Sequence, residues 1–289
     1  MADLTLAQIL DFLAAPFVAS LILTGIHAYL GVHVVERGVI FVDLSLAQIA
    51  ALGATIAILL PVSGGDPHAP SVYWVSLVFT FIGALIFSMI RGKRARIPQE
   101  AIIGITYAVA SAAAILAMSK STSEAEHLKH MLVGNIIAVS WAEVGKTAAL
   151  YGVVGVFHYI FRKQFLAISM NHDRADATGL NVKWWDFLFY ASFGLVVTSS
   201  VAIAGVLLVF CYLIVPSVAA MLFADTIGRR LAIGWTMGTV VSALGVYLSL
   251  MLDLPTGATI VCTFGLVLIL MATVRVLLPR RGSHGLTPV

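Results

Sequence analysis

Long apolar runs separated by short polar connections dominate the chain. An α-helix needs about 20 apolar residues to cross the hydrocarbon core of a membrane. Runs of that length lie at 12–35, 39–61, 72–90, 101–118, 143–161, 186–223, 231–252 and 256–278. The pattern therefore predicts an all-α, polytopic membrane helix bundle.

The run at 186–223 is too long for one crossing. We expect it to divide near Ala204 and Gly205, which gives about nine crossings, whereas a re-entrant segment there would give about eight. Gly205 and Pro216 interrupt this apolar sequence, and such residues occur either beside a pathway or at a plain kink. In the run 231–252, Gly234 and Gly238 are spaced for close approach of a neighbouring helix.

Basic residues occur in alternate connections. Connections rich in Lys and Arg stay in the cytoplasm. With the loop 91–96 placed inside, the basic residues at 37, 162–163, 174, 183, 229–230 and 280–281 fall on the same side. The charges favour nine crossings, with the N-terminus outside and a C-terminal tail at 279–289 in the cytoplasm.

Composition narrows the class of protein. Of 289 residues, 60% are hydrophobic and 11% charged, whereas soluble domains carry about 25% charged residues. A soluble globular enzyme is excluded, and because the basic residues are confined to short loops we expect no nucleic-acid partner. The N-terminus lacks the basic stretch of a signal peptide, so the first run is read as a span. We expect one transmembrane domain over 1–289.

The inner connection at 162–185 is the longest polar segment on the predicted cytoplasmic side. Asn171 precedes an acidic stretch and Gly179 follows it, which predicts a short capped helix that ends at the glycine. Such a helix would offer a docking point to a partner. On the outer side, the mixed segment at 119–141 is compatible with a short interfacial helix before the fifth span.

Catalytic motifs are missing from the sequence. Gly145, Lys146 and Thr147 resemble the end of a phosphate-binding loop, but Ser140 stands where that loop needs glycine. Signatures of serine hydrolases, zinc peptidases and kinases do not occur. We expect the chain to be no enzyme, and any use of ATP to require a partner.

Asp43, near the start of the second span, is the foremost candidate for contact with a transported substrate or metal ion. An ionisable residue within a span usually faces the bundle interior or an aqueous path, because exposure to lipid costs about 2.5–3.5 kcal/mol. The alternative interpretation gives Asp43 no role in transport: it is an acid that reaches water or pairs with Arg37. Gln48, about a turn further on, and His27 in the first span are weaker pathway candidates, and a lone histidine there could equally be a hydrogen-bonded core residue.

Four stretches carry a resemblance to a known family. They are YLGVHVVERGVIFVDLSLAQIAALG at 29–53, PQEAIIGITYAVA at 98–110, HMLVGNIIAVS at 130–140, and VAIAGVLLVFCYLIVPSVAA at 201–220 followed by DLPTGATIV at 253–261. With these residues in view, the chain resembles the membrane permease subunits of the ABC-3 family, which import zinc, manganese and iron.

The resemblance implies a set of partners. It implies a homodimer around a central pathway in the bacterial cytoplasmic (inner) membrane, two cytoplasmic ABC ATPase subunits that hold ATP and Mg, and an extracytoplasmic solute-binding protein. It implies no cofactor bound by this chain. The segment at 171–182 looks like the family's coupling helix. Its expected ATPase-coupling residues here are Asn171, Asp173, Arg174, Asp176, Ala177, Gly179 and Leu180.

One departure from the family concerns the second span. Members carry an Asp and a His four residues apart there, and an ungapped alignment places Leu44 and Gln48 at those positions. Asp43 is displaced by one residue, about 100° around a helix, and an amide is a poorer zinc ligand than imidazole. Either Asp43 substitutes, or the cargo is held differently, or it is no simple divalent ion. A secondary transporter driven by an ion gradient or a membrane protein without transport activity would also fit the pattern of spans.

Overall fold

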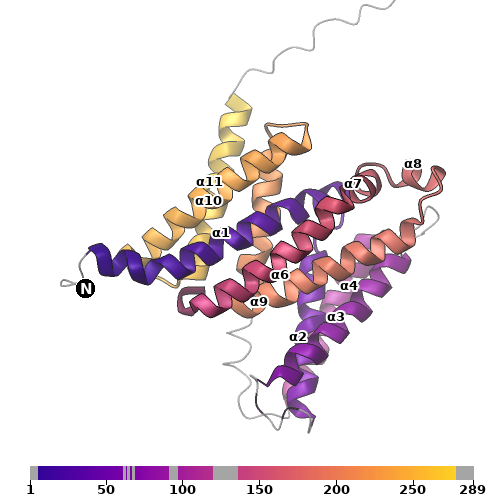
Figure 1. The fold of residues 1–289 in the computed structure, drawn as a ribbon, viewed down its shortest axis with the longest axis horizontal. Coiled ribbons are helices and arrows are strands. Elements are labelled where there is room, and N and C mark those ends of the chain that lie inside the picture. Colours follow the sequence, from indigo (N-terminus) through magenta and orange to yellow (C-terminus); the bar gives the residue numbers. More distant parts are fainter. Residues whose placement is uncertain are drawn as a thin grey trace, which may run out of the picture.

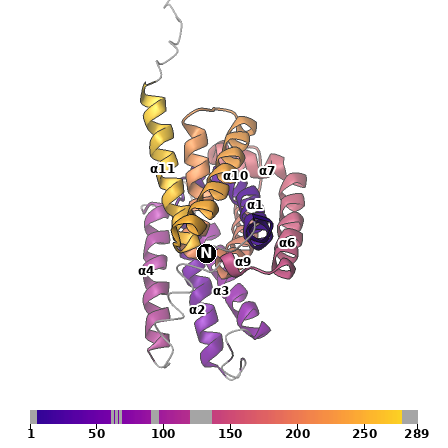
Figure 2. The same ribbon diagram turned by 90° about the vertical axis from the view of Figure 1, so that its left-hand side faces the viewer.

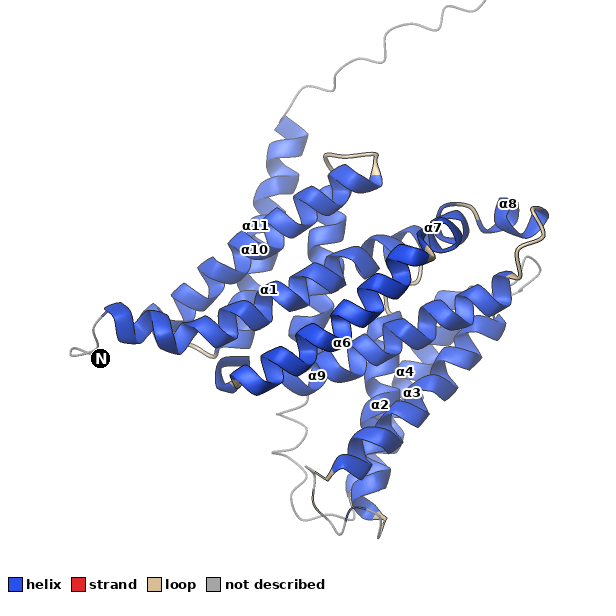
Figure 3. Ribbon diagram, viewed as in Figure 1, coloured by secondary structure: helices blue, strands red, loops and turns tan. Residues whose placement is uncertain are grey.

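The computed structural model describes residues 6–60, 63, 66, 69–90, 97–119 and 136–277. Within these ranges every regular element is a helix and no strand occurs (Figure 3). The predicted all-α fold is confirmed. The C-terminal tail at 279–289, the basic loop at 91–96 and most of the segment at 119–141 lie outside the described residues.

Each apolar run predicted from the sequence contains a helix (Figure 1). The elements are α1 (Leu6–Arg37), α2 (Val42–Leu59), α3 (Pro70–Ile90), α4 (Gln99–Met118), η2 (Ile136–Ala138), α6 (Trp141–Ile160), α7 (Arg162–Met170), α8 (His172–Ala177), α9 (Val182–Met221), α10 (Ile227–Leu252) and α11 (Thr256–Leu277). In the described ranges, 7 helices are long and apolar enough to cross a membrane, and α6 with α7, bent by 75°, makes up to 8.

Helix α9 turns back on itself at Gly205. Near its start, Asp186 forms an ion pair with Arg37 at the end of α1. The next helix begins close by, because Glu36 forms an ion pair with Arg230 near the start of α10. A straight helix with the 40 residues of α9 would be about 60 Å long, so its two ends could not both lie there. Gly205 has non-helical angles, φ 75° and ψ 161°, which supports two passes by α9 and a total of nine crossings.

The helices pack as two groups around α9. Helices α2, α3 and α4 contact one another on one side of it, and α1 with α6 and α10 lies on the other (Figures 1 and 2). Small residues let the backbones approach closely. At Gly31 in α1, a side chain would meet the carbonyl oxygen of Leu213 in α9. At Gly238 in α10, it would meet Thr24 of α1, which fits the spacing seen in the sequence.

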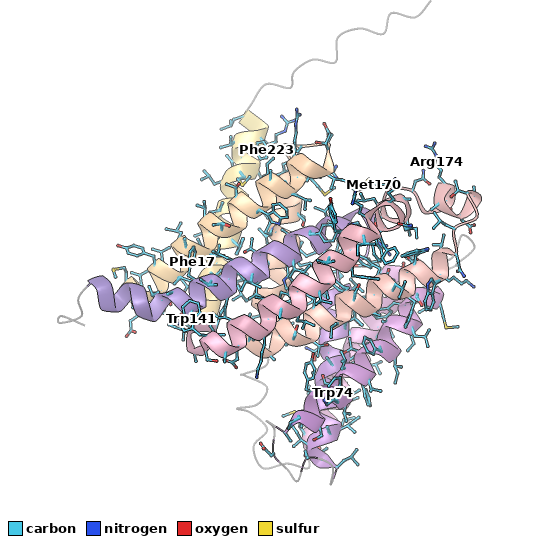
Figure 4. The ribbon with its side chains drawn as sticks, in the orientation of Figure 1. Phe17, Trp74, Trp141, Met170, Arg174 and Phe223 are labelled. Carbon is cyan, nitrogen blue, oxygen red and sulfur yellow. The ribbon has the colours of Figure 1, made fainter. Side chains whose placement is uncertain are left out.

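The outer surface of the bundle is apolar. Trp74 near the start of α3 and Trp141 at the start of α6 are exposed (Figure 4), and the outward faces of α10 and α11 carry large exposed hydrophobic side chains such as Tyr247, Leu266 and Ile269. Tryptophan at helix ends is typical of the boundary between lipid and water. The surface therefore fits a helix bundle that is surrounded by lipid.

Candidate functional site

Asp43 lies in the first turn of α2, where a negative charge is favoured by the helix dipole. The residue is only 2% exposed, and its Oδ1 has no hydrogen-bond partner. The sequence left open whether it pairs with Arg37, but Arg37 forms its ion pair with Asp186 at 2.5 Å. A buried carboxylate oxygen without a partner is costly, and it can offer a coordination position to a cation.

A second carboxylate, which the sequence analysis did not single out, lies beside Asp43. Glu100 is in the first turn of α4, and its Oε1 accepts a hydrogen bond of 3.1 Å from the backbone N–H of Phe41, just before α2. Its Oε2 is buried without a partner. The two carboxylates interact electrostatically. A signal for Glu100 was present, because the topology put the starts of α2 and α4 on the same side.

The second part of α9 faces this pair of acids. Cys211 is buried and interacts electrostatically with Asp43, and the rings of Phe41 and Phe210 stack with centroids 6.5 Å apart. Cys211 and Phe210 lie between Gly205 and Pro216, the two residues that interrupt the apolar run of α9. The structure thus places that segment of α9 against the start of α2.

The short helix α8 forms where the sequence predicted it. The Asn171 side chain accepts a hydrogen bond of 2.9 Å from the backbone N–H of Arg174 and so caps the helix. The segment ends at Gly179, whose φ of 81° suits a glycine stop. Ala175 is 3% exposed and packs on Ile168 of α7 and Val182 of α9.

The candidate coupling residues, unlike Ala175, are mostly exposed on the surface of the protein. Figure 4 shows Arg174 at the outer edge of the molecule. Leu180 is half-buried, and the exposed members of the predicted set are Asn171, Asp173, Arg174, Asp176, Ala177 and Gly179. An exposed helix on a small packed base has the geometry of a docking element.

Comparison with known families decides the class of protein. The model of the ABC 3 transport family matches residues 9–275. The chain belongs to the ABC 3 transport family. The family resemblance seen in the sequence is confirmed.

This ABC 3 family protein is similar to curated membrane components of metal transport systems. It is 29% identical over 202 residues to the manganese transport system membrane protein MntC of Listeria monocytogenes, covering 68% of this chain and 71% of the relative. It is 25% identical over 242 residues to the chelated iron transport system membrane protein YfeC of Yersinia pestis, covering 84% of this chain and 79% of the relative.

A solved structure shares the fold of the ABC 3 family protein. A chain of PsaBC from Streptococcus pneumoniae, solved in complex with Fab, superposes with a TM-score of 0.75 at 23% sequence identity. The match covers 92% of this chain and 95% of that chain. The helical arrangement described above is therefore one found in an experimentally determined protein.

The other pathway candidates of this ABC 3 protein do not meet Asp43. Gln48 is half-buried and follows Asp43 by five residues, about 140° around the helix. Leu44 is also half-buried. In the buried His27, Nδ1–H donates to the Leu23 carbonyl at 2.8 Å, and Nε2 accepts from Ser200 at 3.2 Å. Both ring nitrogens are occupied, so His27 would have to give up a hydrogen bond to contact a cation.

The described part of the ABC 3 protein contains no metal site with three or more side-chain ligands of the His, Cys, Asp or Glu type. Asp43 and Glu100 thus offer few ligands, all of them oxygen atoms. Carboxylate oxygens suit cations such as manganese better than they suit soft, thiolate-preferring metals.

Proposed function

We propose that this chain is the transmembrane permease subunit of an ABC importer that carries a divalent metal ion of the zinc, manganese or iron class. Family membership and the names of the relatives support this function. The observation that carries it is the joint presence of two neighbouring carboxylates, the buried Asp43 and the half-buried Glu100, and of an exposed helix, α8.

The proposed transport mechanism is alternating access. Two copies of the chain surround the pathway in a bacterial inner membrane, and an extracytoplasmic solute-binding protein delivers the ion. Cytoplasmic ATPase subunits bind ATP and Mg, hydrolyse the ATP and move α8. The chain itself binds no cofactor and catalyses no reaction. It supplies the pathway, and the docking helix through which the pathway is opened.

Asp43 is the proposed contact for the ion in transit. The carboxylates of Asp43 and Glu100 attract a cation that has shed part of its hydration shell. A site with few ligands also releases the ion again, because conduction requires binding that is weak enough to leave. The second part of α9, which begins after Gly205, lies against this site through Phe210 and Cys211.

The proposal is tested by uptake of manganese(II) into proteoliposomes that contain the permease, its ATPase subunits and its binding protein. Replacing Asp43 with the isosteric Asn removes the charge and keeps the volume. We expect Asp43→Asn to lower ATP-dependent uptake about tenfold or more, since a buried charge in contact with the ion is worth more than about 1.4 kcal/mol.

The matched control is Asp253→Asn, at the exposed turn between α10 and α11, which should transport like the parent protein. Full uptake by an assembled Asp43→Asn complex would reject Asp43 as the contact. Uptake by the permease alone, driven by an ion gradient without ATPase subunits, would instead support a secondary transporter.

A further inference from the structure

Ser169, the second-last residue of α7, is a buried junction between α7 and α1. Its Oγ accepts a hydrogen bond of 2.9 Å from Nε–H of Arg37 and lies 2.8 Å from Nδ1 of His33. A hydroxyl has one proton and two acceptor lone pairs, so Ser169 shares a second hydrogen bond with His33 in which either partner can be the donor. The end of α1 therefore holds the end of α7 through two hydrogen bonds at one atom.

Arg37 extends the junction to α9. Its NH1 group forms an ion pair of 2.5 Å with Oδ1 of Asp186, and both side chains are buried. The guanidinium also lies over the ring of Phe189, 3.8 Å from the ring centre. One planar side chain thus joins α1, α7 and the first part of α9, a geometry that lysine could not reproduce.

The same junction lies directly next to the base of α8. Ile168, the neighbour of Ser169, is buried against Ala175 of α8 and Val182 of α9. A displacement of α8 therefore acts on Ile168 and Val182, and Ile168 is the chain neighbour of Ser169. From there, hydrogen bonds lead to α1 and the ion pair of Arg37 leads to α9.

On the far side, α1 is tied to α10. Glu36 forms an ion pair with Arg230, and Arg230 also donates a 2.9 Å hydrogen bond to the carbonyl of Ala224, just after α9. Two neighbouring residues of α1 thus form ion pairs with different helices: Glu36 with α10 and Arg37 with the first part of α9. The end of α1 links the α7–α8 segment to the helices that follow Gly205.

Burying an ion pair is an inefficient way to hold helices together, because the desolvation cost often exceeds the Coulombic gain and apolar side chains of similar volume stabilise as well or better. The benefit of the buried pair is a fixed, directional connection. Within the described residues, α8 contacts α9 directly at Val182 and contacts α7 at Ile168, next to this polar junction.

We propose that Arg37, Ser169 and Asp186 form a transmission junction that converts movement of α8 into joint movement of α1 and the first part of α9. The inference rests on the proposed function, in which an ATPase moves α8. These residues are positioning residues, since they act on the pathway through the helices that they join.

The test is the number of manganese(II) ions imported per ATP hydrolysed by the complete complex in proteoliposomes. In Ser169→Ala, both hydrogen bonds to α1 are lost with little change in volume. We expect hydrolysis near that of the parent and a drop in the ratio of about fivefold or more, the lower end of typical coupling between sites. Ser169→Thr keeps the hydroxyl and should restore the ratio, and Arg37→Lys should lower it.

The matched control is Ser192→Ala. Ser192 also bonds a buried histidine, His158, at 2.8 Å, but it joins α6 to α9 and not α7 to α1. Its ratio should equal that of the parent. If uptake and hydrolysis fell together with the amount of assembled complex, or if the Ser169→Ala ratio stayed unchanged, the junction would only support the fold and the inference would be wrong. Absence of ATP-driven uptake by the parent complex would overturn the proposed function, and the inference with it.

Discussion

Gly205 has backbone angles, φ 75° and ψ 161°, that residues with a side chain essentially do not adopt. We expect Gly205→Ala to destabilise the protein by roughly 1–3 kcal/mol, the cost of forcing a residue into such a region. Because α9 folds back at this point, uptake should fall as well. Thermal unfolding of the purified permease in detergent measures the first effect, and proteoliposome uptake measures the second.

Gly152→Ala provides the comparison for Gly205. Gly152 lies within α6, where a methyl group would meet no atom within 4 Å, and alanine favours a helix more than glycine does. Its unfolding temperature should stay equal or rise. Equal stability of the two variants would show that the angles at Gly205 are not needed for the fold.

The site residues were predictable to different degrees. Burial of Asp43 follows from a charge within an apolar run, since lipid exposure of that charge is costly. The division near Gly205 follows from the length of its run. For Glu100, the topology indicated only that it lies on the same side as Asp43, and its position beside Asp43 depends on how α4 packs against α2. Gln48 was selected by family position, and the helical period turns it away from Asp43.

At the scale of elements, the contact between α1 and α9 depends on a missing side chain. A methyl group at Gly31 would overlap the backbone carbonyl oxygen of Leu213 and the hydroxyl of Ser217. Backbone atoms within a helix cannot move aside cheaply, so Gly31→Ala should force α1 away from α9. We expect a loss of about 1–3 kcal/mol, as for other overpacked sites, measured by thermal unfolding.

Gly25→Ala, in the same helix, separates this steric effect from helix propensity. No atom lies within 4 Å of a methyl group at Gly25, so this variant should be as stable as the parent. If Gly31→Ala unfolded at the same temperature as Gly25→Ala, close packing at Gly31 would not contribute to the α1–α9 contact.

The spans were predictable as elements because the period and length of apolar runs are local properties. Helix α8 was predictable because Asn171 and Gly179 mark its ends. Helix α7 was not separated from the polar connection by sequence analysis. Its 9 residues give too short a pattern, and its 75° bend from α6 follows from packing of Phe165 and Ile168 in the interior.

At the scale of the whole molecule, the charge pattern agrees with the contacts between helix ends. The basic residues predicted to share one side include Arg37, Arg174 and Arg230, and the structure places Arg37 beside the base of α8 and next to the ion pair of Arg230. Which partners meet could not be read from the sequence, because Arg37 and Asp186 are separated by 149 residues and nothing local specifies their pairing.

The orientation in the membrane is tested with single-cysteine variants in a background in which Cys211 and Cys262 are replaced by Ala. Arg174→Cys lies on α8, and Asp253→Cys lies at the exposed turn between α10 and α11, on the predicted outer side. In intact cells without an outer-membrane barrier, a membrane-impermeant maleimide should label Asp253→Cys and leave Arg174→Cys unlabelled. After permeabilisation, Arg174→Cys should react fully.

The result bears on the proposed function, in which the ATP-hydrolysing subunits are cytoplasmic. An odd number of crossings with basic connections inside predicts that α8 faces the compartment that contains ATP. Labelling of Arg174→Cys in intact cells would place α8 outside, where an ATPase could not move it, and a polar junction at Ser169 could then transmit no nucleotide-driven motion. Labelling of Asp253→Cys alone would place α8 and the junction at Ser169 on the cytoplasmic side, where an ATPase subunit can bind α8.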